Sequence, residues 1–491
     1  MIIVSITGPD MRRALAQVAG SSRYADLFEF RVDLIRSADI GRLLASTRKP
    51  AIVTCRPKWE GGMFAGSESD RLNILRTASL LGAQFIDIEV RSNPRVIRDF
   101  VRRQSDTQVI LSYHHLTRRL PDVRYVYRKL VAYSPAIVKF AYPAHDAAEN
   151  RLAFDFLRLA RLDHRKGVAI AMGEAGEPSR ILYKKFGGWG TYAAPEDGTP
   201  AAPGQIRASL LTRLYRSERL SPSTKVFGVV GGQVRHSKGI FVHNALFARA
   251  RSNAVYSRFP VRNLKGFMEK MGPLLDGFSV TIPHKQAVMR YLSGVDKTTE
   301  RIGAVNTVIR KGKRLYGTNT DAPGALDAIE SVSKVKGKRI LIAGAGGAAR
   351  AIAFEALRRG AKVLISNRTG RRAKRLAAQF GMTVVPMKGA RLSTADLGTE
   401  AFDVVVNATS VGMVPNIHET PVDKAMLKGK VVFDVVYNPT ITRMLRQAKS
   451  VGARIVTGGE MYLNQAVRQS VIFCRRKPDV RLMRRILARE S

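Results

Sequence analysis

One lysine of this chain lies in an apolar segment, where burial would disfavour its charged form. Lys139 ends an apolar run, and His114 and Glu60 lie at the ends of earlier strand-like segments. Burial disfavours the charged form of an amine, and a Schiff-base lysine needs its neutral form. A nearby imidazole titrates near neutral pH, so it can remove a proton beside an iminium and return it to a leaving hydroxyl. These residues predict a covalent active site, the alternative being a lysine that merely extends from a strand end to solvent.

A second group of residues predicts a nucleotide-dependent site. The turn Gly344-Ala345-Gly346-Gly347 follows an apolar strand-like run, Arg339–Ala343, and precedes a helical pattern from about Ala348 to Arg359. This order of strand, glycine turn and helix is typical of dinucleotide sites, in which the helix N-terminus faces a pyrophosphate. Upstream, the chain carries the polar set Lys285, Asn306 and Asp321. Two separate reactive sets indicate a bifunctional enzyme.

The sequence after the glycine turn favours NADP over NAD. An NAD site typically carries an acidic residue about 20 positions beyond the turn, where it binds the ribose diol. No Asp or Glu occurs from Ala356 to Ala395, and this interval contains Ser366-Asn367-Arg368-Thr369-Gly370-Arg371-Arg372. Arg368 and Arg372 can bind a 2′-phosphate. A solvated basic helix start is the alternative, but it leaves the missing carboxylate unexplained.

The elements that must position the first site alternate between strand-like and helix-like patterns. Eight candidate strands occur in the first 200 residues, at 2–7, 27–34, 51–56, 85–90, 108–113, 137–142, 168–172 and 190–194. Eight strands separated by helices predict a (β/α)8 barrel, whose active site lies at the carboxyl ends of the strands. Glu60, His114, Lys139 and Arg180 all fall at or just after such ends.

The chain divides into three predicted α/β domains. A polar segment at 215–224 has linker composition, so the barrel is expected to cover residues 1–220. Residues 225–330 are expected to form a small α/β substrate domain. Residues 335–491 are expected to form a Rossmann dinucleotide-binding domain with C-terminal helices.

The first half resembles type I 3-dehydroquinate dehydratases over roughly residues 1–210. The segments that carry the resemblance are Glu29-Phe30-Arg31-Val32-Asp33, Arg56-Pro57-Lys58-Trp59-Glu60-Gly61-Gly62, Ser112-Tyr113-His114, Val138-Lys139, Ser179-Arg180 and Pro203-Gly204-Gln205. The resemblance implies that Lys139 forms the imine with the C3 ketone, that His114 is the general acid/base and that Glu60 orients it. It further implies that Arg180 binds the substrate carboxylate and that Glu29, Arg31, Arg56 and Gln205 hold the hydroxyls and carboxylate.

Two positions depart from that family's pattern. Ala201 stands where members commonly carry a serine, which removes one hydroxyl that could contact substrate. His115 follows the catalytic histidine where members tend to carry an acidic residue. The register favours His114 as the reacting imidazole, with His115 as a neighbour that perturbs its titration.

The second half resembles shikimate dehydrogenases from about residue 225 to the end. The matching segments are His236-Ser237-Lys238, Val280-Thr281-Ile282-Pro283-His284-Lys285, Gly303-Ala304-Val305-Asn306-Thr307, Gly317-Thr318-Asn319-Thr320-Asp321, Asn367-Arg368-Thr369, Asn407-Ala408-Thr409-Ser410-Val411-Gly412-Met413, Asp434-Val435-Val436-Tyr437 and Gln465-Ala466. Gly239 departs from this pattern, because members usually continue His-Ser-Lys with a serine.

The resemblance implies roles for these residues. Lys285 and Asp321 would form the catalytic pair. Substrate would contact Ser237, Thr281, Asn306, Tyr437 and Gln465. NADP(H) would contact Gly344, Gly346, Gly347, Ala348, Asn367, Arg368, Thr369, Arg372, Thr409 and Gly458.

Composition limits the remaining function classes. The formal net charge is +43, an excess that would attract nucleic acid at low salt. The basic residues are nevertheless scattered through ordinary helix and strand patterns, without a stripe interleaved with aromatics, so we expect steering of anionic substrates and no specific nucleic-acid partner. Two cysteines, Cys55 and Cys474, cannot form a disulfide framework or a zinc site, which favours a reducing cytoplasm.

Neither a membrane location nor a metal is expected. Residues 1–7 enter a strand without the pattern of a signal or transit peptide, and no apolar run approaches the roughly 20 residues of a membrane span. Imine formation and hydride transfer need no metal ion. The sequence does not fix an oligomeric state.

The sequence thus predicts a shikimate-pathway enzyme with two activities. It would dehydrate 3-dehydroquinate to 3-dehydroshikimate and reduce that ketone to shikimate with NADPH. Three alternatives stay open: a dehydrogenase half that prefers quinate, one degenerate half that serves as scaffold, or a basic nucleic-acid-binding protein on an enzyme-derived fold.

Overall fold

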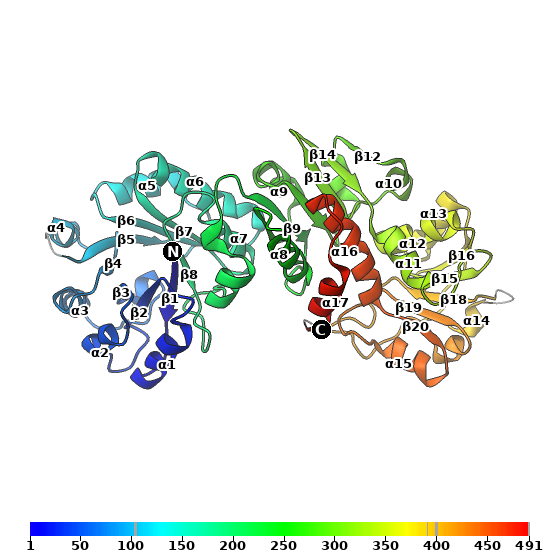
Figure 1. The fold of residues 1–491 in the computed structure, drawn as a ribbon, viewed down its shortest axis with the longest axis horizontal. Coiled ribbons are helices and arrows are strands. Elements are labelled where there is room, and N and C mark those ends of the chain that lie inside the picture. Colours follow the sequence, from blue (N-terminus) through cyan, green and yellow to red (C-terminus); the bar gives the residue numbers. More distant parts are fainter. Residues whose placement is uncertain (103–105, 390, 398–400, 490–491) are drawn as a thin grey trace. The chain divides into compact units, whose positions relative to one another are not determined.

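The structure, a computed structural model, describes residues 1–102, 106–389, 391–397 and 401–489 (Figure 1). These residues form two compact units. Unit 1 comprises Met1–Gly228, Gln233–Ser237 and Asn253–Leu275; unit 2 comprises Val229–Gly232, Lys238–Ser252 and Asp276–Ser491. The domain limits expected from the sequence, 1–220, 225–330 and 335–491, stay a prediction.

Unit 1 contains the expected parallel barrel. Its strands are β1 (Ile2–Ile6), β2 (Leu27–Arg31), β3 (Ala51–Thr54), β4 (Phe85–Glu89), β5 (Gln108–His114), β6 (Ile137–Pro143), β7 (Lys166–Met172) and β8 (Thr191–Ala193). They are hydrogen-bonded in the order β7-β6-β5-β4-β3-β2-β1-β8, so the barrel is nearly closed and the predicted architecture is confirmed. The strand expected at 27–34 ends earlier, at Arg31, where the Leu34 N–H bonds back to the Arg31 carbonyl at 2.9 Å and closes a turn.

Helices follow the barrel strands in alternation (Figure 1). They are α1 (Met11–Ser21), α2 (Ile40–Ala45), α3 (Glu68–Leu80), α4 (Pro94–Arg102), α5 (Val123–Val131), α6 (Asn150–Leu162) and α7 (Glu177–Leu182). Asp10, Asp39 and Asp122 cap the starts of α1, α2 and α5, each accepting a backbone N–H of the first turn. Such caps satisfy N–H groups that a helix cannot bond internally.

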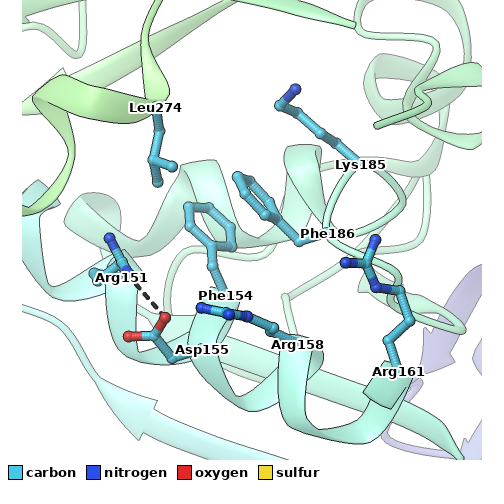
Figure 2. A pocket seen from close by; sticks show the side chains of 8 residues that line it. All are labelled: Arg151, Phe154, Asp155, Arg158, Arg161, Lys185, Phe186 and Leu274. Atoms are coloured by element: carbon cyan, nitrogen blue, oxygen red, sulfur yellow. Dashed lines mark hydrogen bonds and ion pairs between the residues drawn. The ribbon is translucent and has the colours of Figure 1, made fainter. Parts of the chain in front are cut away.

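A pocket of about 170 Å³ opens on unit 1 beside α6. Figure 2 shows its lining, which consists of Arg151, Phe154, Asp155, Arg158, Arg161, Lys185, Phe186 and Leu274. The rings of Phe154 and Phe186 stack with centroids 3.9 Å apart. None of these residues belongs to either predicted site.

A second sheet has the order β10-β9-β11-β13-β14-β12. Its strands are β9 (Lys225–Gly231), β10 (Ala254–Pro260), β11 (Gly277–Val280), β12 (Gly294–Val295), β13 (Thr307–Lys311) and β14 (Arg314–Thr318). Helices α8 (Gly239–Arg249), α9 (Leu264–Lys270) and α10 (Lys297–Ile302) connect them. Strands β13 and β14 form an antiparallel hairpin. Helix α11 (Asp321–Glu330) follows the hairpin and begins at Asp321.

The third sheet is parallel and has the order β17-β16-β15-β18-β19-β20. Its strands are β15 (Arg339–Ala343), β16 (Lys362–Ser366), β17 (Thr383–Val384), β18 (Val404–Asn407), β19 (Val431–Asp434) and β20 (Arg454–Val456). The order reverses between β15 and β18, and a dinucleotide binds at the carboxyl ends of the strands at such a reversal. The predicted strand 339–343 and the Rossmann-type sheet are confirmed.

The remaining helices of unit 2 are α12 (Gly347–Arg358), α13 (Gly370–Phe380), α14 (Thr394–Leu397), α15 (Arg443–Ser450), α16 (Gly458–Cys474) and α17 (Val480–Arg489). Helix α12 begins one residue before the predicted start. Among the described residues, no helix is long and apolar enough to cross a membrane. The described residues also hold no cluster of three or more His, Cys, Asp or Glu side chains that could bind a metal.

Candidate active sites

Lys139 lies inside the barrel and faces carboxylates rather than an apolar wall. Its side chain on β6 is 5 % exposed. The Nζ atom donates to Asp87 Oδ2 at 2.8 Å, lies 3.7 Å from Glu29 Oε1 and sits 4.0 Å from the centroid of the Tyr192 ring. The amine therefore pairs with a buried carboxylate that the sequence analysis did not identify.

Asp87 and Glu89, which the sequence analysis missed, form the charged floor of the site. Both are fully buried on β4. Arg56 bridges them, with Nη2 2.9 Å from Asp87 Oδ2 and Nη1 bonded to Glu89. Burial opposes ionisation of Asp87, but the charges of Arg56 and Lys139 outweigh it and hold the pKa of Asp87 well below its usual value. The sequence could have indicated these two acids, because they occupy alternate positions of an apolar strand and such positions share one face of the sheet.

His114 is fixed by Glu60. The His114 Nδ1 lies 2.9 Å from Glu60 Oε2, and the His114 backbone N–H donates to the same oxygen at 3.1 Å. Burial, together with the charges of Arg56 and Lys139, lowers the pKa of His114 well below its usual value, so the imidazole is neutral at neutral pH. Burial raises the pKa of Glu60 to about 8. Which of Nδ1 and Glu60 donates in this bond depends on the tautomer of His114, and the Nδ1–H tautomer leaves Nε2 to accept a proton.

The neighbouring His115 faces the loop after β5. Its Nε2 is 2.8 Å from Thr117 Oγ1 and 2.5 Å from the Arg119 carbonyl, and its Nδ1 is 3.4 Å from Tyr113 Oη. The two adjacent histidines therefore have separate partners. Of the pair, His114 is the one in contact with Glu60.

Arg180 is a buried cation without a carboxylate partner in the described part of the chain. It is 1 % exposed on α7, where Nη1 donates to the Tyr192 carbonyl at 3.0 Å and Nη2 to the Pro203 carbonyl at 3.3 Å. The Nε atom has no hydrogen-bond partner among the described residues. Burial lowers the pKa of Arg180 to about 9. A buried guanidinium with an unused N–H fits an anionic ligand.

The other predicted residues of this half are held by local contacts. Glu29 accepts hydrogen bonds from Ser5 Oγ at 2.6 Å and from Thr54 Oγ1 at 2.9 Å. The guanidinium of Arg31 binds the Asp33 carboxylate through two bonds, at 2.8 and 2.7 Å. Gln205 Nε2 donates to Ser5 Oγ at 3.2 Å, and the backbone N–H of Ala201 donates to Gln205 Oε1 at 2.7 Å. The alanine thus orients Gln205 through its backbone.

The second site is built around an ion pair in unit 2. Lys285 Nζ donates to Asp321 Oδ2 at 2.6 Å, and Asn306 Nδ2 donates to Asp321 Oδ1 at 2.8 Å. Asp321 is the first residue of α11 and is 6 % exposed. Thr320 supports Asn306, because its backbone N–H donates to Asn306 Oδ1 at 2.8 Å. The structure therefore brings together the three polar residues that the sequence grouped.

Gln465 and Thr281 lie on elements that border this ion pair. Gln465, on α16, has Oε1 3.5 Å from Thr320 Oγ1. Thr281 directly follows β11, and its carbonyl accepts the His284 N–H at 3.0 Å in the turn that leads to Lys285. The ring of Tyr437 packs against that of Tyr462 of α16 in a tilted arrangement, with centroids 5.2 Å apart. Ser237 belongs to unit 1, and its place in the second site stays a prediction.

The glycine turn closely approaches neighbouring atoms. Gly344 has φ +119°, and a Cβ there would lie 2.8 Å from the Ala408 carbonyl oxygen. A Cβ on Gly347, the first residue of α12, would lie 3.4 Å from Lys285 Cδ, whereas Gly346 faces open space. At Gly458 a Cβ would clash with the Val436 carbonyl at 2.5 Å. Open space before a helix N-terminus fits a dinucleotide pyrophosphate.

The basic segment after β16 is exposed. Arg368 and Arg372 are exposed, and within the described ranges neither has an acidic partner. Asn367 Nδ2 donates to the Thr369 carbonyl at 3.0 Å just before α13, and Thr369, which precedes α13, is exposed as well. Exposed guanidinium groups at this position fit a 2′-phosphate.

Thr409 and Ala348 complete the set of residues predicted to contact NADP(H). Thr409 follows β18, and its Oγ1 donates to Asn407 Oδ1 at 2.7 Å. Ala348 lies in the first turn of α12. Both are therefore at the carboxyl ends of the strands where the sheet order reverses.

Comparison with protein families separates the same two halves. Residues 2–222 match the model of type I 3-dehydroquinase. Residues 229–308 match the shikimate dehydrogenase substrate binding domain, and residues 327–454 match shikimate / quinate 5-dehydrogenase. The fold and its two sites thus define a class of protein, a type I dehydroquinase barrel joined to a shikimate-dehydrogenase-like unit.

Individual relatives narrow this class. The chain is 38 % identical over 477 residues to a bifunctional 3-dehydroquinate dehydratase/shikimate dehydrogenase, chloroplastic, of Arabidopsis thaliana, covering 91 % of this chain and 77 % of the relative. It is 38 % identical over 273 residues to an NADP(+) shikimate dehydrogenase of Methanocaldococcus jannaschii, covering 54 % of this chain and 96 % of the relative. A crystal structure of a shikimate dehydrogenase in complex with NADP+ covers 55 % of this chain and 97 % of its own, with a TM-score of 0.51 and 34 % identity. The chain belongs to the family of bifunctional 3-dehydroquinate dehydratase/shikimate dehydrogenases.

Proposed function

We propose that the chain catalyses two consecutive reactions, each in its own unit. Unit 1 dehydrates 3-dehydroquinate to 3-dehydroshikimate, and unit 2 reduces 3-dehydroshikimate to shikimate with NADPH. The observation that carries this proposal is that each unit holds a complete set of proton-transfer groups. Lys139 lies with the His114–Glu60 pair in unit 1, and Lys285 lies with Asp321 in unit 2.

The dehydration begins at Lys139. Its neutral amine attacks the C3 carbonyl, and loss of water leaves an iminium that makes the C2 protons acidic. Asp87 accepts a hydrogen bond from Nζ at 2.8 Å and so fixes the position of the amine. His114 Nε2 then takes one C2 proton to give an enamine. The enamine expels the C1 hydroxyl, to which His114 returns the proton as water forms, and hydrolysis of the product imine regenerates Lys139.

Glu60 and Arg180 support these steps. One oxygen of Glu60 bonds both the backbone N–H and the ring Nδ1 of His114, which fixes the direction of Nε2. Arg180 is proposed to bind the substrate carboxylate, since its guanidinium is buried and its Nε is unpaired among the described residues. The hydroxyls are proposed to contact Glu29, Arg31, Arg56 and Gln205.

In unit 2, Lys285 is proposed to give a proton to the carbonyl oxygen of 3-dehydroshikimate. Asp321 holds the lysine at 2.6 Å and keeps its ammonium directed. NADPH would supply the hydride when bound, and the open space at Gly346 before α12 would hold its pyrophosphate. Arg368 and Arg372 are proposed to bind its 2′-phosphate. Ser237, Thr281, Asn306, Tyr437 and Gln465 are proposed to hold the substrate.

The test assays the two half-reactions separately on the purified full chain. We expect formation of 3-dehydroshikimate from 3-dehydroquinate without cofactor, and oxidation of shikimate with NADP+. Absence of either reaction would mean that the corresponding half is degenerate. Faster oxidation of quinate than of shikimate would identify the second half of the chain as a quinate-preferring dehydrogenase.

We propose a cytoplasmic location and small-molecule substrates as partners, with no specific nucleic-acid or membrane partner. Both cysteines are free, Cys55 buried and Cys474 partly exposed, which suits a reducing compartment. Fractionation of the native cell tests the location.

A further inference from the structure

A buried glutamine of helix α16 bridges two strands next to the second site. Gln469 is 4 % exposed. Its Oε1 accepts a hydrogen bond from Ser279 Oγ at 3.1 Å, and its Nε2 donates to Thr307 Oγ1 at 2.9 Å. Ser279 of β11 and Thr307 of β13 are direct partners in the antiparallel ladder. One carboxamide thus joins the hydroxyl groups of both strands.

The hydrogen bonds continue from Gln469 to the ion pair. The Thr307 hydroxyl donates to Asn306 Oδ1 at 2.9 Å, and Asn306 Nδ2 donates to Asp321 Oδ1 at 2.8 Å. The Thr307 hydroxyl has a single proton to donate. Because Gln469 Nε2 donates to the Thr307 oxygen, the hydroxyl proton remains available for Asn306 Oδ1. In each of these three hydrogen bonds, the donor therefore lies on the α16 side and the acceptor on the Asp321 side.

The direction of these bonds matters for the orientation of Asn306. Its carboxamide could turn over and exchange the oxygen with the nitrogen. In that orientation the amide oxygen would face the Asp321 carboxylate, which is repulsive. Three donors to Oδ1 oppose the turn, namely the Thr320 backbone N–H at 2.8 Å, the Thr307 hydroxyl at 2.9 Å and the Thr320 hydroxyl at 3.3 Å. Gln469 Nε2 also lies 3.3 Å from the Asn306 carbonyl.

We propose that Gln469 is a positioning residue of the dehydrogenase, which acts through Thr307 to hold the Asn306 amide group against Asp321. The inference deepens the proposed function of unit 2 and rests on it. Among the described residues, no hydrogen bond joins Gln469 directly to Lys285 or Asp321. The alternative is a core glutamine that only ties α16 to the sheet and to His243, with which its side chain also hydrogen bonds.

The test is Gln469→Met in the full chain, because methionine keeps the length of the side chain and removes the donor. Shikimate oxidation should lose about two- to twelve-fold in kcat/KM for shikimate, the range for one neutral hydrogen bond. The KM for NADP+ should stay within about two-fold, because α16 acts on the substrate side, and dehydration by unit 1 should be unchanged.

Ser470→Ala is the matched control. Ser470 is also buried on α16, and its hydroxyl bonds the Ala466 carbonyl at 2.7 Å and lies 3.5 Å from His243 Nδ1. This variant perturbs the same helix without touching Thr307, so its kinetics should match wild type. Equal losses in both variants, or a wild-type kcat/KM in Gln469→Met, would overturn the inference. A wild type that reduces no substrate would overturn the proposed function as well.

A double-mutant cycle tests the route through Thr307. Thr307→Val keeps the shape of the side chain and breaks the same link, so it carries the test if Gln469→Met does not fold. If Gln469 acts through Thr307, the double variant should lose no more than the more damaging single change. Fully additive losses would show that Gln469 acts by another route.

Discussion

Replacement of Arg180 by Met should remove substrate binding from the barrel while leaving the free protein nearly as stable. Burial lowers the pKa of Arg180 to about 9. At ~1.4 kcal/mol for each tenfold change in the protonation equilibrium, the buried charge costs roughly 5 kcal/mol relative to an exposed arginine. The substrate carboxylate is expected to recover much of this cost, because a paired guanidinium tolerates burial.

Two effects of the replacement oppose each other in the free protein. Removing the buried charge relieves roughly 5 kcal/mol. The Tyr192 and Pro203 carbonyls then lose their donor, at ~1–3 kcal/mol each. The thermal midpoint without ligand should therefore change by only a few degrees. The stabilisation that 3-dehydroshikimate gives the wild type should disappear, because a ligand stabilises only the state that it binds.

Kinetics provide the decisive measurement for Arg180→Met. Breaking one partner of a buried charge pair costs about 3–5 kcal/mol, so kcat/KM for dehydration should fall by about 10²–10⁴-fold. The assay follows the ultraviolet absorbance of the conjugated product, with shikimate oxidation by the same sample as the control for folded protein. Arg180→Lys should recover little, since an ammonium lacks the planar fork. A Met variant within three-fold of wild type would refute the assignment of Arg180 to the carboxylate.

Four other changes test the remaining assignments. Lys139→Ala should abolish dehydration and the covalent adduct that borohydride traps with substrate, while shikimate oxidation persists; an adduct in the variant would disprove the imine assignment. Lys285→Ala should lower the dehydrogenase kcat by about 10²–10⁴-fold with little change in NADPH affinity, and the reverse pattern would assign it to binding. Arg368→Ala combined with Arg372→Ala should weaken NADPH but not NADH, as measured by both KM values; equal wild-type affinity for the two cofactors would contradict it. Because the lowered pKa of His114 moves protonation of the base to lower pH, the dehydration rate should hold as pH falls through about 6.5, and a half-maximal rate there would place His114 in solvent.

Local sequence patterns were sufficient for the elements of this chain. The apolar run at 339–343 and the glycines after it predicted β15 and α12, with an error of one residue at the start of the helix. Alternation of strands and helices predicted the barrel, because this pattern allows few packed arrangements. The strand at β2 was overestimated, since the turn after Arg31 depends on a backbone hydrogen bond that no residue type announces.

Reactive residues were found where their type was unusual for their surroundings. Lys139 stood out in an apolar strand, and Arg368 and Arg372 stood out where an NAD site would carry an acidic residue. The acids Asp87 and Glu89 could have been found in the same way as Lys139. What the sequence determined by itself was therefore the set of elements and the kinds of group available for chemistry.

Only the tertiary structure decided which of these groups meet. Asp87 reaches Lys139 from 52 positions away in sequence, and Gln469 reaches Thr307 from 162 positions away. The two adjacent histidines look equivalent in the sequence, but His114 alone of the pair contacts Glu60. Charge, desolvation and hydrogen-bond direction depend on distances between strands and helices, and packing of the whole sheet sets those distances. Residue types thus fixed the chemistry that was possible, and the fold selected which of it each side chain can perform.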